Sequence, residues 1–554
     1  MPTTDLIPML PYILLSLPLL HLLYTHTSNP LRLIPAAHPL APWTSLWIAY
    51  IRWRGRENAT LKDAHARYGA VVCLGPREVS VNCVVGGIRE VYAGGFAKGE
   101  EGGEEGRGEG FNWYAFFGNY GGIPNMFSTG ANKPHSTRKR MLSNIYSKST
   151  ILSSPPLLTS THRILATRFL PLLATPPPPF TPTPSTPTIL NITPIINAAT
   201  MDIVTAYIFG LASSSNLLQK TDELMWFLDL YNSRRSFNFW PQEFPRVTAW
   251  VGGWWRLVPR WVDEANGGIE RWTLGMCEGA AGVVEALQEK REGGETTVEV
   301  QDVPVVYQQL STSIAKDVSK KTASPSNNDD VTETIKLTVA SELLDHLAAG
   351  FDTSSITLTY AIHELSTHPA IQSELRRELL SLTSPPSSLP PPKTIDALPF
   401  LNAVVHETLR LHPAIPGPQP RVTPPQGCKL GDGSSGVLGG GGEYYVPGGV
   451  RVSASAGLLH MNEEVFEEPE EWRPERWLGK EGLSKEGKRW FWAFGSGGRM
   501  CIGSHLALYQ MKYILYSLYT TYATSIVDDT GIEQIDAYTA PPASDQLIIK
   551  LTKV

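Results

Sequence analysis

Residues 494–503 read F-G-S-G-G-R-M-C-I-G, and this stretch decides the fold of the chain. It places Cys501 in a glycine-rich segment, with Arg499 two residues before it and Phe494, Gly497 and Gly503 at fixed spacing. A single cysteine is most often a small buried hydrophobic residue, and a group of glycines is most often a turn. From average residue usage, however, this pattern should arise by chance on the order of once in ten thousand chains of this length. The combination therefore indicates a functional site around the Cys501 sulfur.

The pattern F-x-x-G-x-R-x-C-x-G resembles the haem-ligand loop of cytochrome P450 monooxygenases. In such a setting, backbone amides moderate the charge of an iron-bound thiolate, and a nearby cation holds an anionic cofactor. The resemblance implies haem b as the cofactor, with Cys501 as the axial ligand of its iron. It assigns Phe494, Gly497, Arg499 and Gly503 to cofactor binding. The fold that it implies is mainly α-helical with a smaller β-rich region, preceded by an N-terminal transmembrane helix.

The longest predicted helix, residues 332–367, reads A-A-G-F-D-T-S-S over residues 348–355. Gly350 costs roughly 1 kcal/mol relative to alanine inside a helix, and the following hydroxyls compete with the backbone hydrogen bonds. Taken alone, the segment favours a close crossing of two helices through small residues. It also resembles the family's oxygen-activating motif A-G-x-[DE]-T-[ST]. That resemblance implies that Thr353 donates a hydrogen bond to bound oxygen and that Asp352 relays protons.

Glu407 and Arg410 are three residues apart in E-T-L-R and therefore lie on one face of a helix. Such a pair is usually a surface salt bridge of little energetic value. The segment 472–477, W-R-P-E-R-W, supplies Arg476. Together these residues resemble the family's E-x-x-R and P-E-R signatures, which implies a buried carboxylate between two guanidinium groups. Their expected role is a structural brace of the loop that leads to Cys501.

Residues 133–149 form a basic helix candidate. A solvated face explains most runs of charge. Here the run also resembles the helix that family members, especially those of filamentous fungi, place across the haem propionates. By that likeness His135, Lys139 and Arg140 are candidates for propionate binding, and Arg138 is an alternative candidate if the register of the helix differs.

Other candidates at the cofactor and substrate follow from the same resemblance. Arg421, in the segment 413–421, is a further propionate candidate. The expected contacts to substrate are Trp113, Phe116, Ala349, Ala414 and Ile415. For Trp113 and Phe116, the alternative and more common role is to anchor their loop on the core.

The 554 residues carry a formal net charge of -6, which gives no reason to expect a nucleic-acid partner. The five cysteines are scattered and odd in number, which argues against a disulfide framework and a zinc site and favours a reducing compartment.

Residues 6–24 carry no charge and are long enough to cross a bilayer, although three prolines weaken this prediction. A cleaved signal peptide is the rival interpretation, but no Lys or Arg precedes the apolar run. Arginines follow it, so the positive-inside rule predicts a single-pass anchor in the endoplasmic reticulum membrane with the catalytic domain in the cytosol. We therefore divide the chain into an anchor (1–28), a stiff, extended proline-rich connector (29–43) and a catalytic domain (44–554).

Four further segments have predictions of their own. Residues 225–261 are rich in tryptophan, and ordinary packing and a lid that dips into the membrane surface are equally compatible with them. Residues 288–330 are polar and are expected to form a loop or insertion, 171–187 an extended or disordered insertion, and 431–442 a lengthened hairpin loop.

The resemblance implies a monooxygenase that inserts one oxygen atom from O2 into a lipophilic small molecule. Electrons would come from NADPH through NADPH-cytochrome P450 reductase, with cytochrome b5 as a further possible donor, because the chain has no flavin or nicotinamide fingerprint. The likeness to fungal members favours tailoring of a polyketide, terpenoid or alkaloid. The alternatives are a sterol, fatty-acid or xenobiotic hydroxylase, a hydroperoxide isomerase of the same fold, and a haem-binding sensor.

Overall fold

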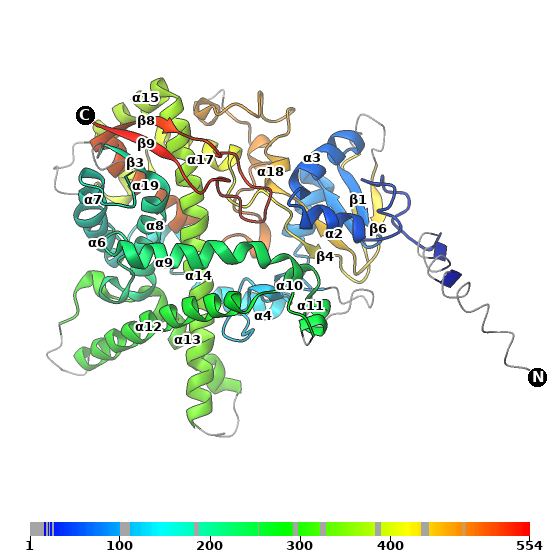
Figure 1. Cartoon of the computed structure of the whole chain (residues 1–554), viewed down its shortest axis with the longest axis horizontal. Coiled ribbons are helices and arrows are strands. Elements are labelled where there is room, and N and C mark those ends of the chain that lie inside the picture. The colour runs from blue at the N-terminus through cyan, green and yellow to red at the C-terminus, as the bar shows by residue number, and fades with distance from the viewer. Residues whose placement is uncertain are drawn as a thin grey trace, which may run out of the picture.

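A computed structural model describes residues 16–17, 20, 23–24, 27–99, 111–181, 188–252, 254–291, 297–321, 328–382, 389–433, 442–479 and 482–554. Most of the helices form one large body. Most of the strands lie together at one side of this body, beside α2 and α3 (Figure 1). This division agrees with the predicted architecture of a large helical region and a smaller β-rich region.

The helices that build the large body and its edges are α2 (Leu46–Trp53), α3 (Glu57–Tyr68), α4 (Asn132–Leu142), α5 (Lys148–Ile151), α6 (Pro155–Ile164), α7 (Leu170–Ala174), α8 (Ile192–Phe209), α9 (Thr221–Ser233), α10 (Phe239–Glu243), α11 (Pro245–Gly252), α12 (Arg260–Arg291), α13 (Val305–Lys321), α14 (Asn328–Thr367), α15 (Pro369–Leu380), α16 (Pro392–Asp396), α17 (Pro399–Leu411), α18 (Ala456–Leu459) and α19 (Ser504–Thr521). Short 3₁₀ turns join several of them, among them η2 (Trp113–Phe117), η5 (Arg234–Phe237) and η7 (Pro474–Trp477).

The strands are β1 (Val71–Gly75), β2 (Glu78–Val81), β3 (Ile189–Asn191), β4 (Arg421–Val422), β5 (Cys428–Leu430), β6 (Tyr444–Val446), β7 (Arg451–Ser453), β8 (Tyr522–Asp528) and β9 (Ile548–Lys553). They form a sheet of order β1-β2-β7-β4, a second of order β3-β9-β8, and the hairpin β5-β6. In the first sheet β2 and β7 pair in parallel, which brings residues far apart in the chain side by side.

Helix α14 runs through the centre of the molecule, and α8 packs against it (Figure 1). A Cβ on Gly350 would lie 3.0 Å from both methyl groups of Val204 on α8. The glycine therefore permits the close helix crossing that was the alternative interpretation of the motif. Helix α8 is also the one described helix that is apolar and long enough to span a membrane, and 89% of that stretch is buried inside the protein.

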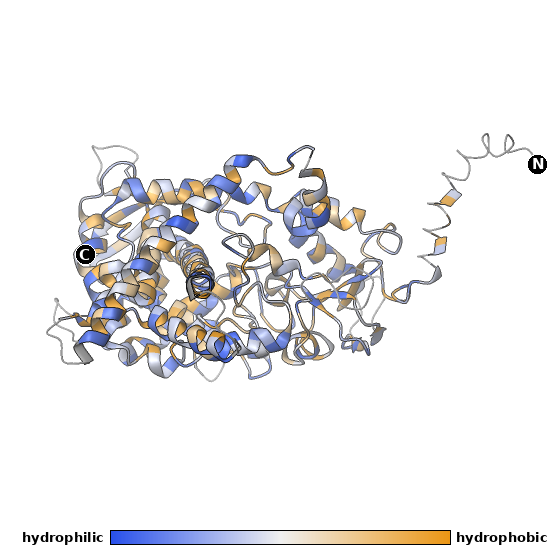
Figure 2. Ribbon diagram, turned by 90° about the horizontal axis from the view of Figure 1, so that it is seen from below, coloured by the Kyte–Doolittle hydropathy of each residue, from blue (hydrophilic) through white to orange (hydrophobic). Residues whose placement is uncertain are grey.

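The predicted anchor, residues 6–24, lies mostly outside the described residues, and its described positions extend away from the body (Figure 2). Residues 29–43 contain no helix, as the prolines predicted, but they are not an extended spacer. They form successive turns, and the backbone of Ala36 pairs with that of Cys73 in β1. Leu31 and Ile34 are buried against the β region, so burial of apolar side chains holds this segment on the body.

The sequence prediction for residues 288–330 was wrong for much of the segment. Helix α12 continues to Arg291, and α13 occupies Val305–Lys321. Val306, Leu310 and Ile314 recur at helical spacing and are buried against the core. A single apolar stripe in a polar segment was therefore enough to form a helix. The prediction of an extended or disordered insertion at 171–187 was wrong for its first part, because residues 171–174 belong to α7 and Phe180 is buried in the core. Residues 182–187 and most of the tip of the β5-β6 hairpin lie outside the described residues.

Candidate active site

A cavity of about 260 Å³ lies between α14 and the loop that precedes α19. This volume suits a molecule rather than a few waters, since one water occupies about 30 Å³. Its walls include Thr353 from α14, Cys501 from the loop, and Ala414 and Ile415 from the segment after α17. Residues separated by up to 150 positions in the chain thus meet at one site.

The loop presents the sulfur of Cys501 to the cavity. The backbone N–H of Cys501 donates to the carbonyl of Phe494 (3.0 Å), which closes the loop. Gly497 has φ +71, and a Cβ there would lie 2.1 Å from the carbonyl oxygen of Tyr92, so only glycine fits this turn. Burial raises the pKa of the Cys501 thiol, whereas the backbone N–H groups of Gly503 and Ser504 and the Lys139 ammonium oppose that rise. These donors suit a sulfur that is held as a thiolate by a metal.

Besides His346, whose Nε2 lies 3.6 Å from the Glu342 carboxylate, five basic side chains line the same cavity: Lys98, His135, Lys139, Arg421 and Arg499. Within the described part of the chain, none of the five forms an ion pair with a carboxylate. Burial, reinforced by the neighbouring arginines, lowers the pKa of Lys98 well below its usual value. Burial and the Arg499 charge lower the pKa of His135 to about 3, and burial with Arg421 lowers that of Arg499 to about 9.

Buried basic groups whose positive charges would repel one another are stabilised in their charged form when an anion lies between them. The cluster is therefore matched to a cofactor with two carboxylates, such as the propionates of haem. The guanidinium group of Arg499 donates from Nη1 to the Thr129 carbonyl (2.8 Å) and also contacts the Gly130 carbonyl. These contacts hold the guanidinium group in place. The Lys139 Nζ donates to the carbonyls of Gly498 (2.9 Å) and Met500 (2.8 Å), which ties α4 to the cysteine loop. The residues present thus fit a haem.

Sequence reasoning missed Lys98 and wrongly included Arg140 in this cluster. His135 and Lys139 are four residues apart and share the inward face of α4, whereas Arg140 lies on the outer face and contacts Thr137. Arg138 pairs with Glu342 (3.0 Å) instead of lining the cavity. Lys98 lies within the glycine- and glutamate-rich stretch 94–110, whose sequence shows no periodicity that could point to it.

The face of α14 that lines the cavity carries Ala349, Gly350 and Thr353. The Oγ1 of Thr353 donates to the carbonyl of Ala349 (2.7 Å), so it must rotate before it can bind another acceptor. Asp352 is buried and does not line the cavity. Its carboxylate pairs with Arg235 of η5 (2.8 Å) and accepts a hydrogen bond from the Tyr231 hydroxyl (3.3 Å).

Trp113 and Phe116 do not line the cavity, contrary to their assignment as substrate contacts. The Trp113 indole instead donates to the Glu243 carboxylate of α10 (2.7 Å), and its ring packs on Tyr538 at 5.2 Å. The aromatic residues that line the cavity include Phe127 and Tyr538 instead. The η2 segment is thus the loop anchor that was the alternative, because a buried indole N–H requires an acceptor.

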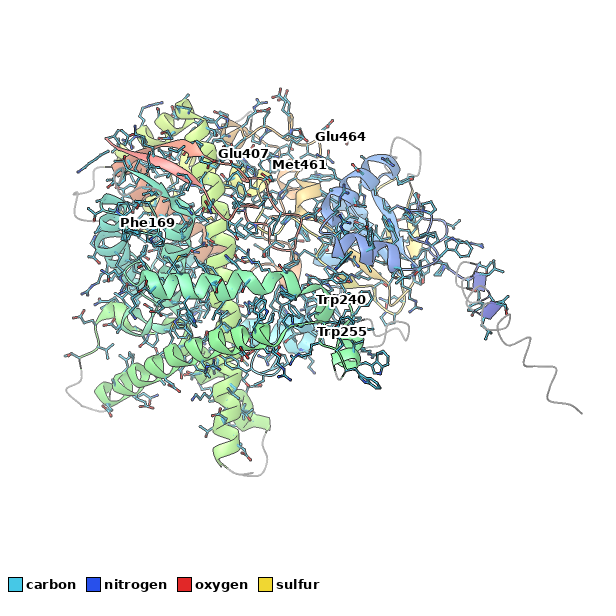
Figure 3. All side chains as sticks on the ribbon, viewed as in Figure 1. Phe169, Trp240, Trp255, Glu407, Met461 and Glu464 are labelled. Atoms are coloured by element: carbon cyan, nitrogen blue, oxygen red, sulfur yellow. The ribbon has the colours of Figure 1, made fainter. Side chains whose placement is uncertain are left out.

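Glu243 belongs to a buried network at the edge of the tryptophan-rich segment 225–261, which is the candidate lid. It pairs with Arg52 of α2 (3.3 Å) and Arg451 of β7 (3.2 Å), and both arginines also pair with Glu78 of β2. Beyond this attachment the lid is exposed: Trp250, Trp254 and Trp255 have exposed fractions of 74%, 90% and 78%. Figure 3 shows Trp255 at the outer edge, whereas Glu407 lies in the interior. Ordinary core packing therefore does not explain these tryptophans.

The predicted brace is assembled around the buried Glu407. Its carboxylate accepts hydrogen bonds from Arg410 (2.9 and 2.8 Å) and Arg476 (2.8 Å). It also accepts the Arg473 backbone N–H (2.9 Å) and the Trp477 indole N–H (2.8 Å). With its acceptors satisfied, the ion is stable inside the protein and holds α17 against η7.

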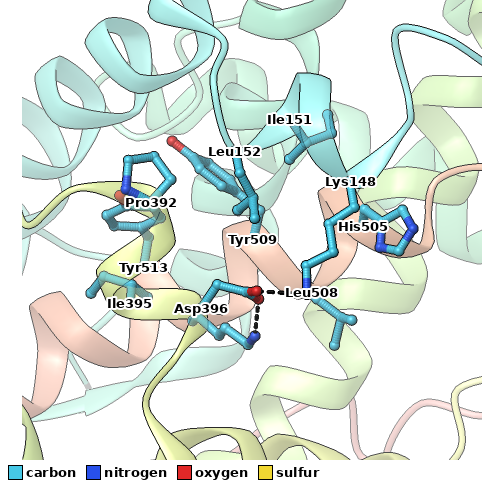
Figure 4. Close-up of a pocket in the computed structure, with 11 residues that line it drawn as sticks. Lys148, Ile151, Leu152, Pro392, Ile395, Asp396, His505, Leu508, Tyr509 and Tyr513 are labelled. Atoms are coloured by element: carbon cyan, nitrogen blue, oxygen red, sulfur yellow. Dashed lines mark hydrogen bonds and ion pairs between the residues drawn. The ribbon is translucent and has the colours of Figure 1, made fainter.

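A smaller hollow lies beside α19, where Lys148 (2.7 Å) and Lys512 (2.6 Å) both pair with Asp396 (Figure 4). These ion pairs connect α5 and α16 to the helix that follows Cys501. The hollow has room for about one water and contains none of the predicted catalytic residues. We therefore assign it a structural role.

Comparison with known proteins agrees with this geometry. The family model "Cytochrome P450" matches residues 276–548. Cytochrome P450 monooxygenase avaI of Aspergillus versicolor is 28% identical over 81% of this chain and 94% of its own length. Cytochrome P450 monooxygenase ucsK of Acremonium sp is 26% identical over 86% of this chain and 84% of its own length. Cytochrome P450 monooxygenase tazI of Aspergillus terreus is 39% identical over a shorter region, 30% of this chain and 31% of its own length.

The matched region contains α14, the brace around Glu407 and the Cys501 loop, and the full-length relatives extend the likeness to the N-terminal half. The chain belongs to the cytochrome P450 monooxygenase family of oxidoreductases.

Proposed function

We propose that this chain is a haem-thiolate monooxygenase that inserts one oxygen atom from O2 into a lipophilic small molecule and tailors a fungal secondary metabolite. The observation that carries the proposal is the cavity, which places a cysteine sulfur, an unpaired cation cluster and the Thr353 face of α14 around one space. A bound haem supplies the activation of O2 and the transfer of oxygen. The chain supplies the ligand, the binding groups and the control of protons.

Cys501 would hold the iron through Sγ, and a thiolate ligand favours cleavage of the dioxygen bond. Arg499, Arg421, Lys98, Lys139 and His135 would hold the propionates, which would relieve their mutual repulsion. Thr353 Oγ1 would present a proton on the cavity side of α14. Asp352, one residue earlier, would pass protons from the lid side, where it meets Arg235 and Tyr231.

Two electron donors suit this scheme: NADPH-cytochrome P450 reductase, and cytochrome b5 as a second donor. The chain contains no nucleotide-binding fingerprint of its own. Residues 6–24 would anchor the chain in the endoplasmic reticulum membrane with the catalytic domain in the cytosol. The exposed tryptophans of the lid suit contact with the headgroup region of the same bilayer.

The substrate end of the cavity is apolar and aromatic, which favours a lipophilic substrate over a sugar or a nucleotide. A sterol, fatty acid or xenobiotic would also enter such a site. The organisms of the compared relatives are fungi, and this supports the choice of a fungal metabolite.

The decisive test is Cys501→Ser in the purified full chain. We expect the variant to lose the red-shifted Soret band of the reduced carbonmonoxy form, because a serine oxygen cannot replace the thiolate. Wild-type enzyme should form product only with NADPH and reductase. An unchanged spectrum in the variant would overturn the ligand assignment. Product formed from a hydroperoxide without NADPH would favour the isomerase, and haem binding without any product would favour the sensor.

A further inference from the structure

Asp345 is an acidic side chain on the cavity wall that has no part in the scheme above. Among the residues that line the cavity it is the one carboxylate. Asp345, Ala349 and Thr353 are spaced by four residues on α14, so all three lie on the same face of the helix. A charged group therefore stands in the space that also holds the oxygen-facing threonine.

The neighbours of Asp345 are engaged elsewhere. The Glu342 carboxylate accepts the Met126 backbone N–H (3.0 Å) and pairs with Arg138 (3.0 Å). The Nδ1 of His346 is hydrogen bonded to the Tyr146 hydroxyl (2.9 Å), and its Nε2 lies 3.6 Å from the Glu342 carboxylate.

Lys98, a second basic group whose charge acts on Asp345, is also engaged elsewhere. Its Nζ donates to the Phe127 carbonyl (2.6 Å) and lies 3.6 Å from the centre of the Tyr114 ring. Bound propionates would engage it further. In the described part of the chain, Asp345 forms no hydrogen bond and no ion pair.

This isolation has a free-energy cost. Burial raises the pKa of Asp345 to about 7; the charges of His346 and Lys98 oppose the rise, and that of Glu342 adds to it. A carboxylate in a poorly solvated space is stable as an ion only with a partner. A cation delivered by a ligand would provide that partner.

The cavity also contains surfaces that accept a cation. The rings of Phe127 and Tyr538 line it, and aromatic faces attract ammonium groups. Lys98 already uses the Phe127 ring in this way, with its Nζ 3.9 Å from the ring centre. Beyond Asp345 and His346, α14 contributes small residues to the lining, namely Ala349, Gly350, Thr353, Ser354 and Thr357, which leave room beside the carboxylate.

We propose that Asp345 anchors a protonated nitrogen of the substrate, so that the enzyme oxidises a lipophilic amine. The inference rests on the proposed monooxygenase function and selects the alkaloid class among its candidate substrates. Eight residues of helix separate Asp345 from Thr353, which is roughly 12 Å at 1.5 Å per residue. The oxidised carbon should therefore lie on the order of 10 Å from the nitrogen, not next to it.

The test measures binding to the haem-loaded full chain by equilibrium dialysis. The probes are 4-phenylbutyltrimethylammonium, whose quaternary nitrogen cannot ligate iron, and the neutral isostere in which carbon replaces that nitrogen. We expect wild-type enzyme to prefer the cation by about tenfold, as an ion pair at this depth permits. Asp345→Asn should lose that preference, and Asp345→Glu should retain most of it. Glu333→Gln, an exposed acid on the same helix, is the matched control and should behave as wild type.

Equal preference for the cation in wild type and Asp345→Asn would overturn the inference, as would a wild-type enzyme with no preference. The carbonmonoxy spectrum of each variant separates this outcome from failure of the proposed function. A normal red-shifted Soret band without cation preference rejects the anchor alone. Absence of that band in wild type rejects the haem-thiolate assignment itself.

Discussion

The partly buried Arg235 and the buried Asp352 form an ion pair, with Nη2 of the arginine 2.8 Å from Oδ1 of the aspartate. Asp352 belongs to the central helix α14, and Arg235 belongs to η5, at the beginning of the tryptophan-rich lid. The acid predicted to relay protons is therefore directed away from the cavity and toward the lid. Movement of the lid and delivery of protons would share one contact.

This pair should be measurable in a double-mutant cycle of Arg235→Gln and Asp352→Asn. Arg235→Gln leaves a buried carboxylate without its cation and should destabilise the protein, whereas adding Asp352→Asn should restore part of the loss. We expect a coupling free energy of about 1–3 kcal/mol from chemical denaturation. Additive effects of the two substitutions would show that the contact does not contribute to stability.

Thr353→Ala should uncouple consumption of NADPH from formation of product. The hydroxyl lines the cavity but is bonded to the Ala349 carbonyl, so its removal leaves the helix intact and deletes one proton donor. We expect at least about a tenfold fall in product per NADPH, with the difference appearing as peroxide or water. Thr353→Ser keeps the hydroxyl and is the matched control. Full coupling in the alanine variant would remove Thr353 from the mechanism.

Glu407 should make the stability of the protein sensitive to acid. Burial alone would raise the pKa of Glu407, but the hydrogen bonds and charge of Arg410, with Arg473 and Arg476, outweigh it and lower the pKa. Because the pKa of Glu407 is lower in the folded protein than in the unfolded chain, its ionised carboxylate stabilises the fold at pH values above the unfolded pKa of about 4.5. This stabilisation is lost as the pH falls through the folded pKa.

Glu407→Gln keeps the shape but removes the charge between two guanidinium groups. We expect it to lower the free energy of unfolding by about 3–5 kcal/mol at neutral pH, with a smaller difference from wild type in acid. Haem content should fall with it, because the brace holds the segment before the Cys501 loop. Denaturation curves at several pH values check this, and a constant difference at every pH would contradict it.

Glu243→Gln should loosen the lid. Burial opposes ionisation of Glu243, but the charges of Arg52 and Arg451 dominate and lower its pKa to about 2, so it is ionised at neutral pH. Its loss leaves two buried arginines with less compensation and removes the tie between α10 and the β region. We expect faster hydrogen exchange in α10 and α11 and unchanged exchange in α14.

Asp263→Asn, which removes an exposed partner of Arg256, is the control for the Glu243 variant. The exposed pair should contribute little to stability, so exchange in the lid should match wild type. Equal exchange of α10 in wild type and Glu243→Gln would contradict a role of this network in closing the lid.

Local sequence determined the chemistry of this protein. The motif around Cys501 can be recognised from neighbouring residues alone. The turn requires glycine at 497, and Arg499 stands two residues before the cysteine. The helix 332–367 and the pair Glu407–Arg410 were equally predictable, because helical periodicity places residues three and four apart on one face. The helix α13 was not predicted, because its short stripe of apolar residues lies in a mostly polar segment.

Only the tertiary structure decided which side chains share the cavity. His135 and Arg140 are both candidate basic residues in the sequence, but packing of α4 turns the first inward and the second outward. Lys98 and Asp345 carry no motif, and only the fold brings these two distant residues to the same cavity. Spacing along one helix sets which residues share a face, but the direction of that face depends on long-range packing that no local pattern encodes.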